Sequence, residues 1–135
     1  MSEPWPVESI PDSATVYMRV HKQYIKRGQI SASCFKNQAD PTSPRAGRST
    51  DWSTYSTPEE CRDRARHPRD NAVIELVVGD IRSIEGQSVE HTPIPNAPER
   101  KGNRAHTDVF GDKDDLEVKL RFRRCSKLIL ALCEG

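Results

Sequence analysis

Two histidine-bearing segments hold the residues of this chain that are best suited to chemistry. One runs from Val89 to Pro95 and carries His91, and the other runs from Asn103 to Val109 and carries His106. An imidazole titrates near neutral pH, so a pair of them can transfer protons or bind a metal ion. If the two segments pair as antiparallel strands, both rings lie at one end of the sheet. His91 and His106 are therefore candidate catalytic residues, and the alternative is that they only fix the backbone of the intervening loop.

A second set of polar side chains flanks a long loop. It comprises Ser31, Ser33, Ser49, Asp51, Ser53 and Tyr55. Such groups bind phosphates or sugars, but they also cap turns, because Ser, Thr and Asp satisfy nearby backbone groups. We take Ser31, Ser33 and Asp51, together with Arg82 after a buried strand, as candidate ligand-binding residues. The alternative for Arg82 is an ion pair with Asp80 or Asp51.

The dense basic run lies near the C-terminus and comprises Lys119, Arg121, Arg123, Arg124 and Lys127. It could contact nucleic acid or an acidic partner protein, with Arg121 and Arg124 as candidate partner-binding residues. The alternative is a solvated helix face. The chain as a whole has 21 basic and 20 acidic residues, a net charge of +1, which argues against a general polyanion binder.

Length and composition indicate one small domain. The 135 residues predict a mobile leader over residues 1–13 and a single domain over residues 14–135. No apolar run is long enough to span a membrane, and the N-terminus has no secretory signal, so we expect a cytoplasmic protein. The four cysteines form no CxxC pair and resemble no zinc module, and free thiols are expected because a chain without a secretory signal is expected in a reducing compartment. No metal site and no cofactor are expected.

Local patterns predict the order of the elements. β-branched and aromatic residues predict strands over 14–20, 29–35, 71–84, 88–91 and 105–110, with a bulge or turn at Gly79. Residues 21–27 form a turn or short helix, and residues 36–50 a polar loop. Thr57, Pro58 and Glu60 predict a helix start with a capping box, and that helix continues to about His67.

The C-terminal element is ambiguous. Residues 116–123 alternate as a strand would, whereas apolar residues over a longer span recur at helical spacing. The length of the stretch and its lack of Gly and Pro favour a helix over 112–134. The fold class is therefore α+β. We expect a small, mostly antiparallel sheet with two or three helices, a C-terminal helix packed on the sheet, and long polar loops.

The middle of the chain resembles a family of small bacterial proteins to which no activity is assigned. The resemblance covers roughly residues 16–130 and rests on Gly28 to Phe35, on Ser49 to Glu60 (STDWSTYSTPEE), and on the His91 and Ala105-His106 segments. The basic, proline-containing stretch around Arg45 departs from the family pattern. The resemblance implies a bacterial, cytosolic, single-domain protein.

The opening of the chain is also similar to that of ADP-ribosyltransferase-like folds. The similarity rests on Tyr17, Arg19 and His21 on the first strand, then a short helix, Gly28 and a serine-bearing strand. It implies that Arg19 or His21 holds the nicotinamide-side ribose of the substrate and that Tyr55 stacks on it. A catalytic glutamate near the end of the chain is also implied, and no residue matches it.

These patterns favour a non-enzymatic accessory protein that acts through protein–protein contacts. Its surface would include the long loop, Trp52, Tyr55 and the two-histidine end of the sheet. The first alternative is an enzyme acting on a nucleotide or phosphoester through His91 and His106, or through Arg19, His21 and Tyr55. The second alternative is a nucleic-acid accessory factor that uses the basic run.

Overall fold

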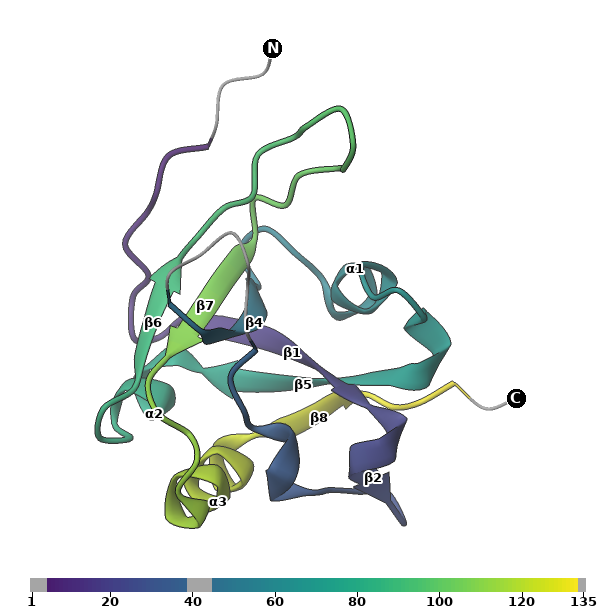
Figure 1. Ribbon diagram of the computed structural model, residues 1–135, viewed down its shortest axis with the longest axis vertical. Helices are drawn as coiled ribbons and strands as arrows, with labels where there is room; N and C mark the ends of the chain where they lie inside the picture. The colour runs from purple at the N-terminus through teal and green to yellow at the C-terminus, as the bar shows by residue number, and fades with distance from the viewer. Residues whose placement is uncertain (1–4, 39–44, 134–135) are drawn as a thin grey trace.

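The computed structural model describes residues 5–38 and 45–133 and confirms the α+β class. Within these residues a six-stranded antiparallel sheet has the order β6-β7-β4-β1-β5-β8 (Figure 1). Its strands are β1 (Thr15–His21), β4 (Gly47–Trp52), β5 (Asn71–Val77), β6 (Ser88–His91), β7 (His106–Phe110) and β8 (Lys127–Leu130). β2 (Ile25–Lys26) and β3 (Gln29–Ile30) form a separate small hairpin.

Three α-helices and three 3₁₀ turns complete the described part of the chain. The α-helices are α1 (Pro58–Asp63), α2 (Val78–Arg82) and α3 (Leu116–Cys125). The 3₁₀ turns are η1 (Lys22–Tyr24), η2 (Ala32–Cys34) and η3 (Pro68–Asp70). Within the ranges 5–38 and 45–133, no helix is both long and apolar enough to cross a bilayer.

β1 runs through the middle of the sheet and separates two faces of different chemistry. Along it Val16, Met18 and Val20 are buried, whereas the alternate residues Tyr17 and Arg19 are only partly buried. A strand places successive side chains on opposite faces, so this alternation defines an apolar face and a polar face. The apolar face forms the main core, as the sequence pattern predicts.

The two faces are covered by different elements. On the apolar face, the core joins β1 and β5 to Val78 and Ile81 of α2 and to Phe122 of α3. Phe122 stacks on Phe35 at 5.4 Å between ring centroids, which connects α3 to the segment after η2. α1 lies against β1 and β5 on the polar face, on the opposite side of the sheet from α3 (Figure 1).

Two of the predicted strands are wrong in part. Residues 29–35 form a strand only at Gln29–Ile30, because the Ser31 side chain accepts a hydrogen bond from the Ser33 N–H and starts η2. The predicted strand over 71–84 ends at Val77, and α2 follows in place of a bulge. Val78 and Ile81 are both fully buried at a spacing of three residues, which suits a helical turn packed on the core.

The C-terminal stretch contains both of the structures that its pattern allows. α3 occupies Leu116–Cys125, so the choice of helix over 116–123 is confirmed. The helix ends well before residue 134, and β8 returns as an edge strand against β5. Ser126 closes the helix because its backbone N–H and hydroxyl both bond to Arg123 O.

β4 lies partly in the stretch that the sequence assigns to a loop. Residues 47–52 form a central strand between β1 and β7, whereas a loop was predicted over 36–50. α1 has the predicted capping box, with Thr57 and Glu60 each bonding to the other's backbone N–H. It ends at Asp63, earlier than predicted, because Ala65 N–H bonds to Arg62 O and tightens the last turn.

The segment before β1 lies against the sheet. Residues 1–4 fall outside the described residues, but Ile10 is 5% exposed and belongs to the core. Arg82 holds this segment by donating to Ile10 O and to the Asp12 carboxylate. The described part of the predicted leader therefore packs as part of the domain.

Candidate functional site

The two candidate histidines lie on neighbouring strands but on opposite faces of the sheet. β6 and β7 are antiparallel, and His91 is paired with Thr107. His91 therefore shares the face of Thr107, while His106, the next residue along β7, points to the other face. The predicted pairing of the two strands is confirmed, but the prediction that the two imidazoles share a site is wrong.

A pocket of about 600 Å³ lies on the polar face of the sheet. Tyr17 and Arg19 of β1, Ser49 and Asp51 of β4, and His106 of β7 contribute to its lining. α1 and the loop from Ile94 to Asn103 form its other walls. This volume lies within the range of about 300–1,000 Å³ typical of small-molecule sites.

The pocket is located where two strands diverge. β1 and β4 pair only at Val16–Trp52 and Tyr17–Asp51, whereas β1 and β5 pair over seven residues. Beyond Tyr17, the edge of β1 that faces β4 bonds to a side chain in place of a strand. Arg48 Nη2 donates to the Arg19 carbonyl oxygen at 2.7 Å. The opening between the strands leaves Arg19 and Ser49 facing the same space.

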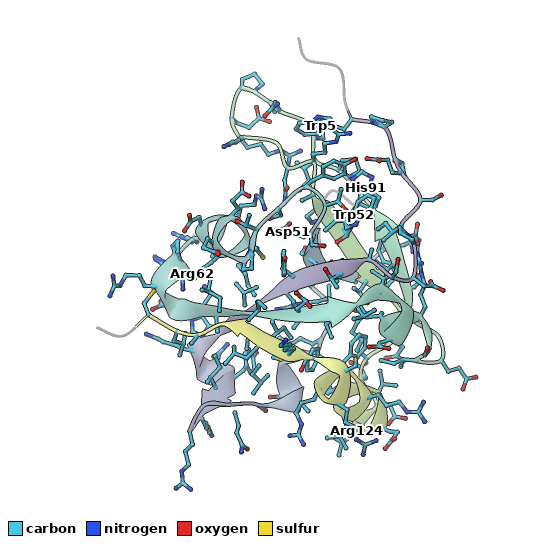
Figure 2. The ribbon with its side chains drawn as sticks, turned by 180° about the vertical axis from the view of Figure 1, so that it is seen from behind. Trp5, Asp51, Trp52, Arg62, His91 and Arg124 are labelled. Atoms are coloured by element: carbon cyan, nitrogen blue, oxygen red, sulfur yellow. The ribbon has the colours of Figure 1, made fainter. Side chains whose placement is uncertain are left out.

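Asp51 bonds to two of the segments that form the wall of the pocket. Its carboxylate is 4% exposed and accepts from Arg64 Nη1 at 2.8 Å and from Asn103 Nδ2 at 2.8 Å. This single carboxylate therefore connects β4 to the end of α1 and to the loop from Ile94 to Asn103. Arg64 also donates to Ser56 Oγ. Figure 2 shows Asp51 between α1 and the Trp52–His91 pair.

The loop over the pocket makes a close backbone contact at Gly102. A side chain there would put a Cβ 2.5 Å from Ile94 O and 2.6 Å from Asn96 N, so only glycine fits. The Gly102 N–H bonds to Asn96 Oδ1, and Ile94 and Asn103 bond to each other through both backbone groups. The loop is thus internally fixed although it is long.

Arg19 supplies positive charge to the pocket. Its Nη1 donates to Cys61 O at 2.8 Å, a neutral carbonyl, and no described carboxylate lies within salt-bridge distance of its guanidinium. The exposed Lys101 adds positive charge, and Arg64 lines the pocket as well but is paired with Asp51. Glu60 and Asp63 bring negative charge from α1, but Glu60 is bonded to the Thr57 N–H in the capping box.

His106 and Ser49 form a hydrogen-bonded pair in the pocket. His106 Nε2 lies 3.3 Å from Ser49 Oγ, and its Nδ1 lies 3.0 Å from Thr92 O and 2.9 Å from Thr92 Oγ1. The Thr92 hydroxyl donates to Asp108 Oδ2 at 2.9 Å. The pair thus belongs to a chain of four side chains that begins at Ser49 and ends at a carboxylate.

His91 occupies a structural position on the other face. It is 2% exposed, accepts from the Glu8 N–H at Nδ1 and bonds to Arg104 O through Nε2. Its ring lies 5.3 Å from that of Trp52 and is stacked with Tyr55 at 6.3 Å. Figure 2 shows His91 and Trp52 together, under the N-terminal segment.

The predicted partner-binding aromatic residues belong to this same cluster. Trp52 is 5% exposed. The Arg104 guanidinium covers the Tyr55 ring at 4.1 Å, and the Tyr55 hydroxyl donates to Glu8. The hydrogen bond to Glu8 is the main cause of a raised pKa of Tyr55, and the positive charge of Arg104 acts in the opposite direction. Neither ring lines the pocket that contains Arg19.

The remaining candidates lie apart from the pocket. Ser31 and Ser33 bond to each other at 2.7 Å in the cap of η2, and His21 caps η1. Arg82 pairs with Asp12, so neither of the expected partners, Asp80 or Asp51, is the one observed.

The basic run also lies apart from the pocket, on α3 and at the start of β8. Lys119 donates to Phe35 O, and Arg121 pairs with the exposed Glu117. Arg123, Arg124 and Lys127 are exposed, and Figure 2 shows Arg124 at the end of the molecule away from Asp51.

The cysteines are free thiols, as predicted. Cys61 lines the pocket, but burial raises the pKa of its thiol to about 12, and burial raises that of Cys34 to about 11. A thiol reacts through its thiolate, so neither group is an effective nucleophile at neutral pH. In the described part of the chain no group of three or more His, Cys, Asp or Glu side chains could hold a metal ion.

Comparisons with known proteins add no family. No protein-family model matches the chain, and neither a curated protein nor a solved structure matches it.

Several residues of the site were not identified from the sequence: Arg64 and Asn103 line the pocket, and Thr92 and Asp108 hold His106. A signal for one of them is present, since His106 and Asp108 are two residues apart on a predicted strand and so share a face. Arg64 and Asn103 meet the strands only through tertiary packing, whereas Thr92 directly follows β6 and its N–H bonds to His106 O.

Proposed function

We propose that this protein binds a nucleotide in the pocket over the opening between β1 and β4. The observation that carries the proposal is Arg19, which lines the pocket and, among the described residues, bonds through its guanidinium only to the neutral Cys61 carbonyl. A guanidinium binds phosphate oxygens through paired, charge-assisted hydrogen bonds. Ser49 and Tyr17 add hydroxyl groups that suit a ribose or a phosphate.

The similarity to ADP-ribosyltransferase-like folds supports a ligand of the NAD type. That similarity implies a basic residue of the first strand in the substrate site, and Arg19 lines the pocket whereas His21 does not. It fits less well elsewhere. Tyr55 packs on the other face of the sheet, and the serine-bearing strand is largely a 3₁₀ turn. We therefore take the substrate class to be a nucleotide and use NAD as one probe among several.

The pocket leads us to prefer this function over the accessory protein that the sequence favours. An accessory role through Trp52 and Tyr55 needs these rings at the surface. Trp52 is buried, and Tyr55 is covered by Arg104. Protein–protein contacts, nucleic-acid binding through α3, and a bacterial cytoplasmic setting stay predictions from the sequence.

Isothermal titration with NAD, ADP-ribose, ATP and inorganic phosphate tests the proposal. We expect the nucleotides to bind, and Arg19→Ala to weaken binding roughly 10- to 100-fold, as loss of charged hydrogen bonds of about 1.5–3 kcal/mol requires. Arg62→Ala is the matched control, because Arg62 lies on α1 and bonds to Ala131 O outside the pocket. If no nucleotide binds to the wild-type protein, the proposal is wrong.

A further inference from the structure

We infer that Ser49 is a nucleophile activated by His106, and that the bound nucleotide is cleaved at a phosphoester bond. This inference rests on the proposed function, since it assigns chemistry to the same pocket. Its basis is the geometry of the pair: a serine hydroxyl and an imidazole nitrogen 3.3 Å apart, both lining one open pocket. A nucleophile within hydrogen-bonding reach of a base, itself held by a third group, is the arrangement that covalent catalysis requires.

The hydrogen bonds of His106 fix which nitrogen acts as the base. Thr92 O is a carbonyl oxygen and can only accept, so His106 Nδ1 must carry the proton in this contact. The Thr92 hydroxyl gives its own proton to Asp108 and can accept from the same Nδ1–H. The neutral ring then presents an unprotonated Nε2 to Ser49 Oγ, as a general base must.

Asp108 and Thr92 act as positioning residues. Asp108 Oδ2 lies 4.0 Å from His106 Nδ1, so it reaches the ring mainly through the Thr92 hydroxyl. The carboxylate stabilises the imidazolium that forms when the base takes a proton. β4 and β7 hold the whole set in place, because Ser49 pairs with Asp108 in the sheet register and projects to the same face.

The reaction has two balanced steps. In the first, Ser49 Oγ bonds to phosphorus, His106 Nε2 takes the serine proton, and the bond from phosphorus to the leaving oxygen breaks as that oxygen receives the proton. In the second, water gives a proton to His106 Nε2 and bonds to phosphorus, and Ser49 Oγ leaves and regains the proton. The sum is phosphoester hydrolysis, and Arg19 and Lys101 supply positive charge in the same pocket.

A fluorophosphonate probe tests the nucleophile directly. Its phosphorus accepts an activated serine and releases fluoride, so the adduct can be located by peptide mass spectrometry. We expect one adduct per chain of the wild-type protein, at Ser49, and none on Ser49→Ala. Ser31→Ala is the matched control, since Ser31 is bonded to Ser33 and does not line the pocket, and it should be labelled like the wild type.

The base and the positioning residues are tested by rate. His106→Gln should slow labelling about 100-fold or more, as loss of a general base does. Thr92→Val and Asp108→Asn should slow labelling while nucleotide titration stays unchanged. If Thr92 and Asp108 had only a structural role, their variants would not slow labelling while leaving nucleotide affinity unchanged.

The outcomes separate the two proposals. Nucleotide binding without an adduct on wild-type Ser49 overturns the nucleophile and leaves the proposed function standing. An adduct at Ser49 without nucleotide binding would support Ser49 as a nucleophile and reject the proposal that the pocket binds a nucleotide. Labelling that is equal in wild type and His106→Gln rejects His106 as the base.

Discussion

Lys113 places a cation inside the protein, and no carboxylate of the described residues lies within salt-bridge distance of it. The residue is 2% exposed, and its Nζ donates to Asn37 Oδ1, Val109 O and Gly111 O. Burial lowers the pKa of this amine from 10.5 to about 8, and repulsion from Arg48 and Lys119 adds to the effect. Lys113 thus links the segment after η2 to the end of β7, at the cost of keeping a poorly solvated charge.

This pKa predicts a stability that rises in mild alkali. Below about pH 8 the amine is charged in both states, and the folded state bears the full cost of burying it. Between about pH 8 and 10.5 the unfolded chain binds more protons than the folded chain, so the free energy of unfolding increases with pH. Urea unfolding of wild type and Lys113→Met at about pH 7 and about pH 9.5 measures the difference between the two proteins. That difference should shift in favour of the wild type at the higher pH, and an unchanged difference would contradict the assignment.

At the scale of elements, α1 is short and depends on its N-terminal cap. It has six residues, and Thr57 and Glu60 satisfy two of its free N–H groups. Isolated helices of this length are unstable in water, so the cap and the contact of Cys61 with β1 must hold it. The pocket depends on the same helix, because α1 supplies the Cys61 carbonyl that positions Arg19.

Removal of the cap should therefore be measurable. Thr57→Ala is expected to lower the free energy of unfolding by about 1 kcal/mol, since it leaves the Glu60 N–H without its acceptor. Thr54→Ala, at an exposed position before the helix, serves as the control. Equal urea midpoints for the two variants would mean that the cap contributes nothing to stability.

The sequence predicted those elements whose signals are local. β1, β6 and β7 have β-branched, alternating residues, and α1 begins with Thr57 and Pro58. The sequence did not predict β4 over its full length, because Arg48, Ser49 and Asp51 are polar and a central strand is usually apolar. Ser49 and Asp51 line the pocket, Asp51 pairs with Arg64, and Arg48 donates to Arg19 O, so the partners of all three come from other parts of the chain.

The candidate site was predicted only in part, for a related reason. Arg19, Asp51 and His106 were identified by residue type, and all three line the pocket. His91 was included because the strand pairing was predicted without a register, and a shift of one residue changes the face on which a side chain lies. Only the pairing of His91 with Thr107 separates the two histidines.

At the scale of the whole molecule, the N-terminal segment binds several elements together. Ile10 fills the core, Glu8 contacts His91, Tyr55 and Arg104, and Asp12 O accepts from the Gly79 N–H at the start of α2. These contacts lie on the face opposite the pocket. The segment therefore stabilises the sheet from behind the site rather than covering its entrance.

Truncation measures this contribution. A chain that begins at Asp12 should lose about 2–4 kcal/mol of unfolding free energy, as expected when a buried isoleucine is removed. Val7→Ala is the control, because Val7 is 75% exposed. Nucleotide affinity of the folded fraction should be retained, and a truncated protein as stable as the wild type would show that the segment is dispensable.

The position of β1 in the sheet also affects how the chain folds during its synthesis. β1 leaves the ribosome before β4 and β5, the strands that flank it in the finished sheet. The strand that pairs along its whole length, residues 71–77, begins 50 residues after β1 ends, so Val16, Met18 and Val20 lack this neighbour until β5 has been made. Such non-local pairing slows folding and exposes apolar strands to aggregation. Yield in a recombinant host should thus depend on chaperone supply and growth temperature more than on the stability of the finished fold.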